Sequence, residues 1–322
     1  MTTKMHQIKA YFDLNFCILQ CLFFSQIYAS TIILVIRAKA LRDHTCRCVF
    51  LIIFYELIDD KYLCVRWYYR LTDRKQAEYI MDSIFSIKKQ LRDLASIPKE
   101  KQSIFFKTGF GHYAEHDQFI GVTVPRLRQL GKAYQNLTLE ELHLFLESPF
   151  NEERLFALLI LVDQYKKAGP QAKEKLYQFY LNNINYVNNW NLVDASAHLI
   201  IGAHLLGGNR ALLFTLARSK ILWERRIAIV STGYFIRNDD LTCTFQLAKL
   251  LLKDSHDLIH KAVGWMLREA GKKDQSQLTV FLNQYAIEMP RTMLRYSIEK
   301  FPEVQRRAFL TASLKSRLIS NE

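Results

Sequence analysis

The feature that most constrains the fold is an apolar stretch that recurs through the second half of the sequence. Five such stretches occur, centred on Ala157, Ala195, Ala228, Ala262 and Tyr296. Their intervals are 38, 33, 34 and 34 residues, and within each stretch the apolar residues have helical rather than strand-like spacing. A period of this length predicts a stack of helix pairs, in which each pair buries its apolar face only against its neighbours.

We therefore predict an all-α fold, a curved α-solenoid whose concave face is lined by one helix from each repeat. The 322 residues include only 11 Gly and 6 Pro, which suits long regular elements. The net charge of +13 favours a polyanionic partner, either nucleic acid or an acidic membrane surface. Beyond residue 64 the only cysteine is Cys243, which excludes an internal disulfide there and fits a reducing compartment such as the cytoplasm.

The first eighty residues do not share this pattern. Residues 14–36 carry no charge and are long enough to span a bilayer, although six polar residues interrupt them. The composition changes near Met81, where MDSIFSIKKQ resembles a natural amino terminus. We interpret residues 1–80 as an extension that is not translated, with translation starting at Met81, or else as a membrane-associated segment. Residues 81–322 form the predicted working domain.

One position in each apolar stretch is expected to line the concave face. The residues found there are Arg154, Asp194, Arg225 with Arg226, His260 with Lys261, and Arg295. Four of the five repeats thus place a base at this position and one places an acid. A row of bases suits the phosphates of a nucleic acid, so we predict that Arg154, Arg225, Arg226, Lys261 and Arg295 bind DNA.

The acid in that row stands close to an aromatic residue. Trp190 and Asp194 are four residues apart, which puts both side chains on one face of a helix. With Trp265 two repeats later, two indoles around a carboxylate would suit a cationic group, through cation–π and Coulomb attraction. The alternative for Asp194 is a helix N-cap, where Asp is favoured. For Trp223 we prefer core packing.

A metal centre is not expected. The segment from His112 to His116 matches the HxxEH spacing of some zinc proteases. That chemistry requires a stable helix, and the glycines just before the segment argue against one. We therefore treat the match as chance.

Three segments, NNWNLVD, LWERRIAI and KAVGWMLREAGK, resemble the AlkD-type DNA glycosylases in their order and spacing. The upstream FFKTG and YAEHDQFIGVTVPRLRQL resemble that family's amino-terminal helices and loop, so the resemblance covers about residues 81–310. It implies HEAT-like repeats that hold double-stranded DNA in the concave face. The implied reaction is excision of positively charged N-alkylated purines, such as 3-methyladenine and 7-methylguanine, by hydrolysis of the N-glycosidic bond without base flipping. We expect no cofactor, and we expect a monomer.

The resemblance also implies roles for individual residues. Trp190 and Trp265 would pack against the backbone sugar at the lesion, Asp194 would be the catalytic carboxylate, and Arg226 would contact DNA near the lesion. The loop departs from the family's usual pattern at Phe110, His112 and His116, in place of Pro, Glu and Gly. These departures concern the amino-terminal DNA contact rather than the core site. The competing hypothesis is a non-catalytic helical-repeat scaffold that binds nucleic acid or protein.

Overall fold

The computed structural model describes residues 50–58, 61–69 and 74–319. The chain forms two compact units, Met1–Ile87 and Lys88–Glu322. Among the described residues, no helix is both long enough and apolar enough to cross a membrane. The uncharged residues 14–36 lie outside the described residues, so their predicted membrane role stays a prediction.

The first unit contains a β-hairpin made of β1 (Phe50–Ile58) and β2 (Lys61–Tyr69). The strands are antiparallel, and their register pairs Phe50 with Tyr69 and Ile58 with Lys61. Their sequences, FLIIFYELI and KYLCVRWYY, are rich in aromatic and β-branched residues, which favour strands. The hairpin lies in the extension, outside the repeats from which the all-α fold was predicted.

Helix α2 (Arg74–Asp93) begins before Met81 and runs across it. The predicted domain boundary at residue 80 therefore falls inside a helix, and the two compact units divide seven residues further on, after Ile87. From residue 74 to residue 319 all regular elements are helical, apart from one isolated bridge between Gln118 and Phe150. This part of the chain agrees with the all-α prediction.

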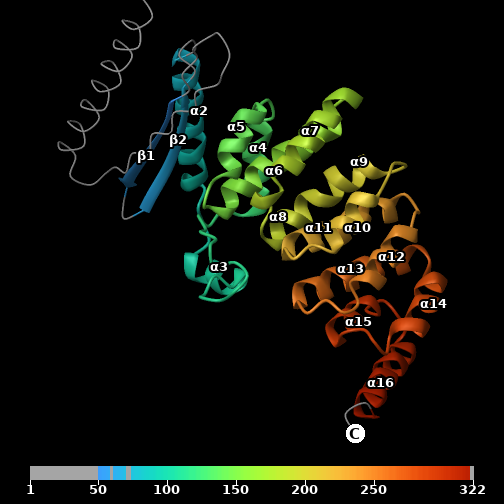
Figure 1. Cartoon of the computed structure of the whole chain (residues 1–322). Coiled ribbons are helices and arrows are strands. Elements are labelled where there is room, and N and C mark those ends of the chain that lie inside the picture. Colours follow the sequence, from blue (N-terminus) through green and yellow to red (C-terminus); the bar gives the residue numbers. More distant parts are fainter. Residues whose placement is uncertain (1–49, 59–60, 70–73, 320–322) are drawn as a thin grey trace, which may run out of the picture. The chain divides into compact units, whose positions relative to one another are not determined.

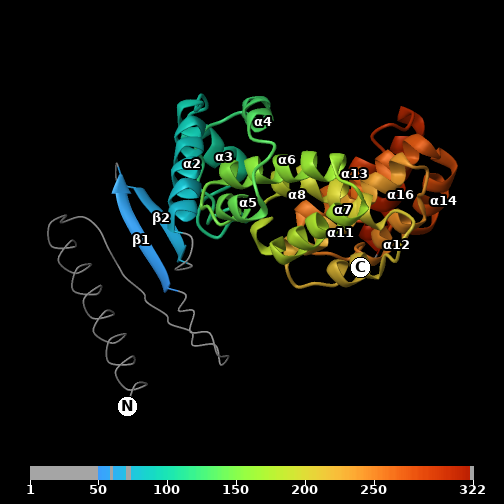
Figure 2. The same ribbon diagram turned by 90° about the horizontal axis from the view of Figure 1, so that it is seen from above.

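The second unit is a succession of helices (Figure 1; Figure 2). Its first two complete helices are α3 (Lys99–Phe106) and α4 (Val124–Ala133). Five pairs follow: α5 (Leu139–Leu146) and α6 (Asn151–Lys167); α7 (Pro170–Asn182) and α8 (Trp190–Ala197); α10 (Ala211–Ala217) and α11 (Leu222–Arg237); α12 (Thr242–Leu250) and α13 (Asp257–Lys273); α14 (Gln275–Tyr285) and α15 (Arg291–Ser297). Helix α16 (Glu303–Ile319) ends the described chain.

The second helices of the pairs form a continuous inner stack. Helix α6 contacts α8, α8 contacts α11, α11 contacts α13, and α13 contacts α15. All five predicted repeat centres lie in these helices, so the predicted pairing is confirmed. Because neighbours cover several faces, α6 and α11 are buried along most of their length. The stack therefore sets which side chains from different repeats meet.

Close backbone contacts fix the spacing within the stack. Helix α8 continues into a π-helical turn, η2 (His198–Gly202), and then the short α9 (Ala203–Leu205). A Cβ atom on Gly202 would lie 2.2 Å from the carbonyl oxygen of Ser231 in α11, so only glycine fits there. Gly264 permits an equally close approach, since a Cβ would lie 2.6 Å from the Met293 carbonyl oxygen in α15.

Candidate functional site

Helix α8 carries both Trp190 and Asp194, and its start is set by Asn189. The Asn189 side chain accepts a hydrogen bond from the backbone N–H of Trp190 at 2.7 Å. Asn189 is therefore the residue that caps the helix, and Asp194 lies inside the helix as its fifth residue. The alternative in which Asp194 is an N-cap is wrong. Its carboxylate therefore does not cap the helix and can interact with a neighbouring helix.

The Asp194 carboxylate is held by Arg226 of helix α11. Arg226 donates from Nε to Oδ1 at 3.0 Å and from Nη2 to Oδ2 at 2.8 Å. Its remaining nitrogen, Nη1, donates to the carbonyl oxygen of Leu258 in α13 at 2.5 Å. One arginine thus joins three successive helices of the inner stack. The Arg226 side chain is only 6% exposed, whereas that of Asp194 is 21% exposed, so the carboxylate remains the accessible member of the pair.

Trp190 packs against aromatic residues from α3 and the following loop. Its indole stacks on Phe106 with ring centroids 5.1 Å apart, and Phe105 meets it nearly edge-on at 5.5 Å. Phe106 in turn stacks on Phe119 at 4.4 Å. One face of the Trp190 indole is therefore covered, and the ring is partly buried. This leaves less of the indole for a ligand than the sequence suggested.

Tyr113 is a site residue that the sequence analysis missed. Its ring lies 5.9 Å from that of the buried Trp223, and Tyr113 packs with Trp190 against the cluster of Phe106, Ala114 and Phe119. Burial raises the pKa of the Tyr113 hydroxyl, while a hydrogen bond with Trp190 and the charges of Lys261 and Arg226 oppose that rise. Tyr113 therefore brings the loop before α4 against α11. In the sequence, only His112 and His116 of the HxxEH spacing around Tyr113 stood out as candidate site residues. Trp223, 8% exposed, packs in the core as predicted.

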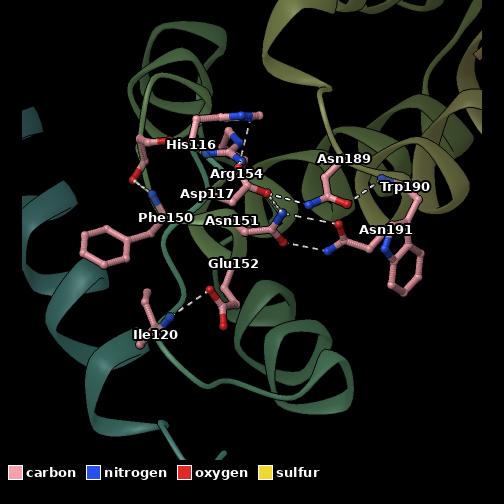
Figure 3. A network of polar contacts seen from close by, with 11 residues as sticks. His116, Asp117, Ile120, Phe150, Asn151, Glu152, Arg154, Asn189, Trp190 and Asn191 are labelled. Carbon is pink, nitrogen blue, oxygen red and sulfur yellow. Dashed lines mark hydrogen bonds and ion pairs between the residues drawn. The ribbon is translucent and has the colours of Figure 1, made fainter. Parts of the chain in front are cut away.

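A buried polar network fixes the start of α8 (Figure 3). Asp117 Oδ2 accepts from Asn189 Nδ2 at 2.6 Å and from Asn151 Nδ2 at 2.8 Å. Asn191 of α8 donates from Nδ2 to Oδ1 of Asn151 in α6 at 2.6 Å, which connects the two helices directly. Asp117 also forms an ion pair with Arg154. Because these groups are buried, each lost bond would leave an unsatisfied partner.

Arg154 is consequently a structural residue in this network. Only 3% of it is exposed, and its Nη1 donates to the Ser148 carbonyl oxygen at 2.7 Å. The sequence placed Arg154 on the surface with the other bases, but its guanidinium points into the network around Asp117 (Figure 3). In this conformation the side chain has almost no surface with which to contact a phosphate.

The other bases of the predicted row also have acidic partners. Arg225 donates to Asp254 at 2.6 Å, and Lys261 pairs with Asp257 at 2.6 Å. Asp194 was predicted to be the one acid in an otherwise basic row, but the structure gives four of the five named bases an aspartate of their own. Asp117 and Asp254 lie in loops that the repeat pattern does not align, whereas Asp257 lies on the same helix as Lys261, four residues before it. Arg295 has no ion pair among the described residues, and with Lys261 it lines a cavity of 420 Å³.

Trp265 does not join Trp190. It lines a separate cavity of 330 Å³, together with His198 and Arg237. His198 follows Asp194 by four residues, at the end of helix α8. No contact between the two indoles is found in the described part of the chain. The predicted arrangement, with Asp194 between two indoles, stays a prediction.

The HxxEH segment is not helical. Residues 109–116 form successive turns, so the two histidines do not share a helix face. Glu115 accepts from the backbone N–H of Gly111 at 2.9 Å, and His116 lies 3.4 Å from Asp117. The described residues contain no cluster of His, Cys, Asp or Glu suited to a metal. In the same loop, Phe110 is 93% exposed.

A stack of helix pairs whose inner helices share a partly exposed carboxylate, an arginine and an indole defines a helical-repeat protein with a polar site. The sequence profile of the family described as "DNA alkylation repair enzyme" matches residues 87–301, about two thirds of the chain. The chain belongs to this family, which confirms the resemblance seen in the sequence.

Comparison with curated proteins gave no significant match. Among solved structures, the chain is similar to a predicted DNA alkylation repair enzyme from Enterococcus faecalis, with 15% identity and a TM-score of 0.49, over 64% of this chain and 95% of that one. It is also similar to AlkD2 from Streptococcus mutans, with 14% identity and a TM-score of 0.43, over 70% of this chain and 99% of that one.

Proposed function

We propose that this protein is a DNA glycosylase that excises positively charged N-alkylated purines, such as 3-methyladenine and 7-methylguanine, from double-stranded DNA. The observation that carries the proposal is the two-bond ion pair between Arg226 and Asp194. It holds a carboxylate oriented and accessible on the helix that begins with Trp190, in a member of a DNA alkylation repair family.

The chemistry suits a fixed carboxylate. The bond between C1′ of the deoxyribose and the base nitrogen breaks, and its electron pair leaves with the base and neutralises the base's positive charge. The sugar is left with oxocarbenium character, and water adds at C1′ and releases a proton. Each oxygen of Asp194 uses one lone pair for Arg226 and retains another. Asp194 can therefore stabilise the sugar cation, orient the water and accept its proton.

The role of Arg226 in this proposal is to position Asp194. Three of its five N–H groups bond to protein groups, and its side chain is only 6% exposed, which leaves little surface for the direct DNA contact implied by the resemblance. Trp190 contributes its remaining face to the sugar cation. Trp265 contributes to the same site only if the cavity it lines approaches Asp194 when DNA binds. Of the five predicted bases, Lys261 and Arg295 have the most surface for a phosphate, because the other three are buried or half-buried in ion pairs.

Release of methylated purines from methylated duplex DNA is the direct test. We expect the wild type to release 7-methylguanine or 3-methyladenine and to leave abasic sites, with binding that weakens as salt rises. A protein that binds the same duplex and releases no base would instead support the helical-repeat scaffold.

A further inference from the structure

The cavity of 330 Å³ that Trp265 lines is bounded by three successive helices of the inner stack. The residues that matter here are His198 at the end of α8, Gly233 and Arg237 on α11, and Trp265 and Lys272 on α13. Its volume is at the lower end of the range of pockets that hold small organic ligands. The cavity combines an apolar part with a group of bases.

The apolar part exists because α11 has no side chain at Gly233. A Cβ atom there would lie 3.4 Å from Met266 Sδ and 3.7 Å from His198 Cβ, which are ordinary contacts. No close backbone approach therefore requires this glycine, and its missing side chain leaves the space open. Trp265, which is partly exposed, lines the same space. Apolar groups beside an indole suit the hydrophobic face of a sugar ring.

Three bases and one acid also line this cavity. Arg237 is exposed, and no acidic side chain pairs with it among the described residues. Lys272 pairs with Glu269 at 2.8 Å and Lys273 pairs with Asp239 at 2.9 Å, yet the two lysine side chains are 45% and 41% exposed. Exposed pairs of this kind are weak, so both ammonium groups can turn to an incoming anion. The buried ion pairs of the predicted row have no such freedom.

The charges around His198 also favour an anion. Burial, together with the positive charges of Arg237 and Lys166, lowers the pKa of its imidazole to about 4. The ring is therefore neutral at pH 7 and has one N–H group, which can donate to a phosphate oxygen. A bound phosphate would also offset the repulsion among the bases around the ring.

We propose that this cavity binds one phosphodiester of the DNA strand that carries the lesion, with the phosphate on Arg237 and the adjoining deoxyribose against Trp265. The four residues from Asp194 to His198 span about 6 Å along a helix, and each strand of B-DNA advances about 3.4 Å per nucleotide. The bound phosphodiester is therefore about one or two nucleotides from the sugar that reacts at Asp194. The choice of DNA rests on the proposed function. Only the backbone is bound, so no base leaves the duplex.

Binding of the full chain to undamaged duplex, followed by fluorescence anisotropy at several salt concentrations, tests the cavity without any excision. We expect Arg237→Gln to weaken binding about fivefold at about 0.1 M salt and to reduce the salt slope by about 0.9, the contribution of one phosphate. Arg218→Gln is the matched control. Arg218 is also exposed and has no acidic partner among the described residues, but it lies at the end of α10, outside the inner stack. This variant should bind within about twofold of the wild type, with an unchanged slope.

Substitution of Gly233 tests the space itself while every charge is kept. Gly233→Leu should fill the cavity and weaken duplex binding about fivefold or more, because the sugar loses its apolar contacts. Gly233→Ala is the matched control, since its methyl group makes only ordinary contacts with Met266 and His198. Urea unfolding shows whether both variants fold. If Gly233→Leu does not fold, the comparison of Arg237→Gln with Arg218→Gln decides.

A neutral methylphosphonate, placed in turn at each phosphate near the lesion, locates the bound phosphodiester. The lesion position is marked by tetrahydrofuran, an abasic-site analogue that has no base to excise. We expect a methylphosphonate about one or two nucleotides away to weaken wild-type binding about fivefold and to leave the binding of Arg237→Gln unchanged. Arg218→Gln should remain as sensitive as the wild type at that position.

The proposal is overturned if Arg237→Gln and Arg218→Gln have equal affinities and salt slopes, or if a folded Gly233→Leu binds as tightly as Gly233→Ala. It is also overturned if no methylphosphonate loses its effect in Arg237→Gln. Excision of methylated purines that accompanies any of these results counts against this cavity alone. Duplex binding that depends on Arg237 and Gly233, in a protein that releases no base, counts against the proposed glycosylase alone.

Discussion

Asp194 and Arg226 are joined by two hydrogen bonds across 32 residues of sequence, and the arginine of this pair is the more deeply buried partner. Arg226 covers little of the carboxylate's surface, because its planar guanidinium contacts both oxygens from one side. The carboxylate is thus oriented by the protein and remains open to a reacting group. Two predictions follow from this geometry.

Asp194→Asn should remove excision and spare binding. The amide keeps the shape of the side chain and one oxygen for Arg226, but it has no charge with which to stabilise a sugar cation. We expect release of 7-methylguanine to fall by about 100-fold or more, with less than about a threefold change in affinity for undamaged duplex. Asp163→Asn is the control, because Asp163 also pairs with a base, Lys166, on its own helix and is 46% exposed. Equal excision by Asp194→Asn and wild type would remove Asp194 from the mechanism.

Arg226→Lys should destabilise the inner stack. An ammonium cannot meet both Asp194 oxygens and the Leu258 carbonyl at once, so at least one buried partner loses its bond. We expect the free energy of unfolding in urea to fall by about 1 to 3 kcal/mol. Arg307→Lys, at an exposed pair with Glu303, should leave the unfolding midpoint unchanged. An unchanged midpoint for Arg226→Lys as well would show that the three-helix connection does not stabilise the fold.

The repeat pattern predicted the pairing of helices well, since burial of one helix face per repeat imposes a period on the sequence. It did not predict that Asn189, rather than Asp194, caps α8. Both residue types favour caps, and periodicity does not locate a helix start to within a few residues. That question is decided by the contact of Asn189 with Asp117, 72 residues away.

The acidic partners of Arg154 and Arg225 could not be predicted from the sequence either. Alignment of repeats compares equivalent positions, whereas Asp117 lies in an irregular loop and Asp254 in a connection between helices. An ion pair across such segments depends on where the loops pack. For the same reason the stacking of Trp190 on Phe106 could not be predicted, because Phe106 lies at the end of α3, outside the aligned repeats.

Asn189→Ala should destabilise the protein through two losses. It removes the cap of α8 and leaves the buried Asp117 carboxylate with one donor fewer. Together we expect a loss of about 1 to 3 kcal/mol in the free energy of unfolding. Asn209→Ala is the matched control, because its side chain accepts from the backbone N–H of Ala211 at an exposed turn. Comparable losses in the two variants would contradict a special role for the buried network.

His198 makes stability depend on pH. Burial lowers the pKa of its imidazole from 6.5 to about 4, and the charges of Arg237 and Lys166 act in the same direction, against the hydrogen bond with the Asp194 backbone. The folded protein therefore keeps His198 neutral at pH 7. As pH falls below 6.5, the unfolded chain takes up the proton first, so the free energy of unfolding decreases until folded His198 also titrates near pH 4.

His198→Gln should remove this pH dependence. The difference between the two pKa values corresponds to about 3 kcal/mol of stability that is present above pH 6.5 and lost towards pH 4. Other groups titrate in the same range, among them His256, whose pKa burial also lowers. The quantity to compare is therefore the free energy of unfolding of the wild type minus that of His198→Gln. It is measured by urea unfolding at pH 7 and again at pH 4.5. That difference should shrink or change sign at the lower pH, because only the wild type incurs the cost of keeping His198 neutral. A difference independent of pH would mean that the imidazole is protonated as readily in the folded chain as in the unfolded one.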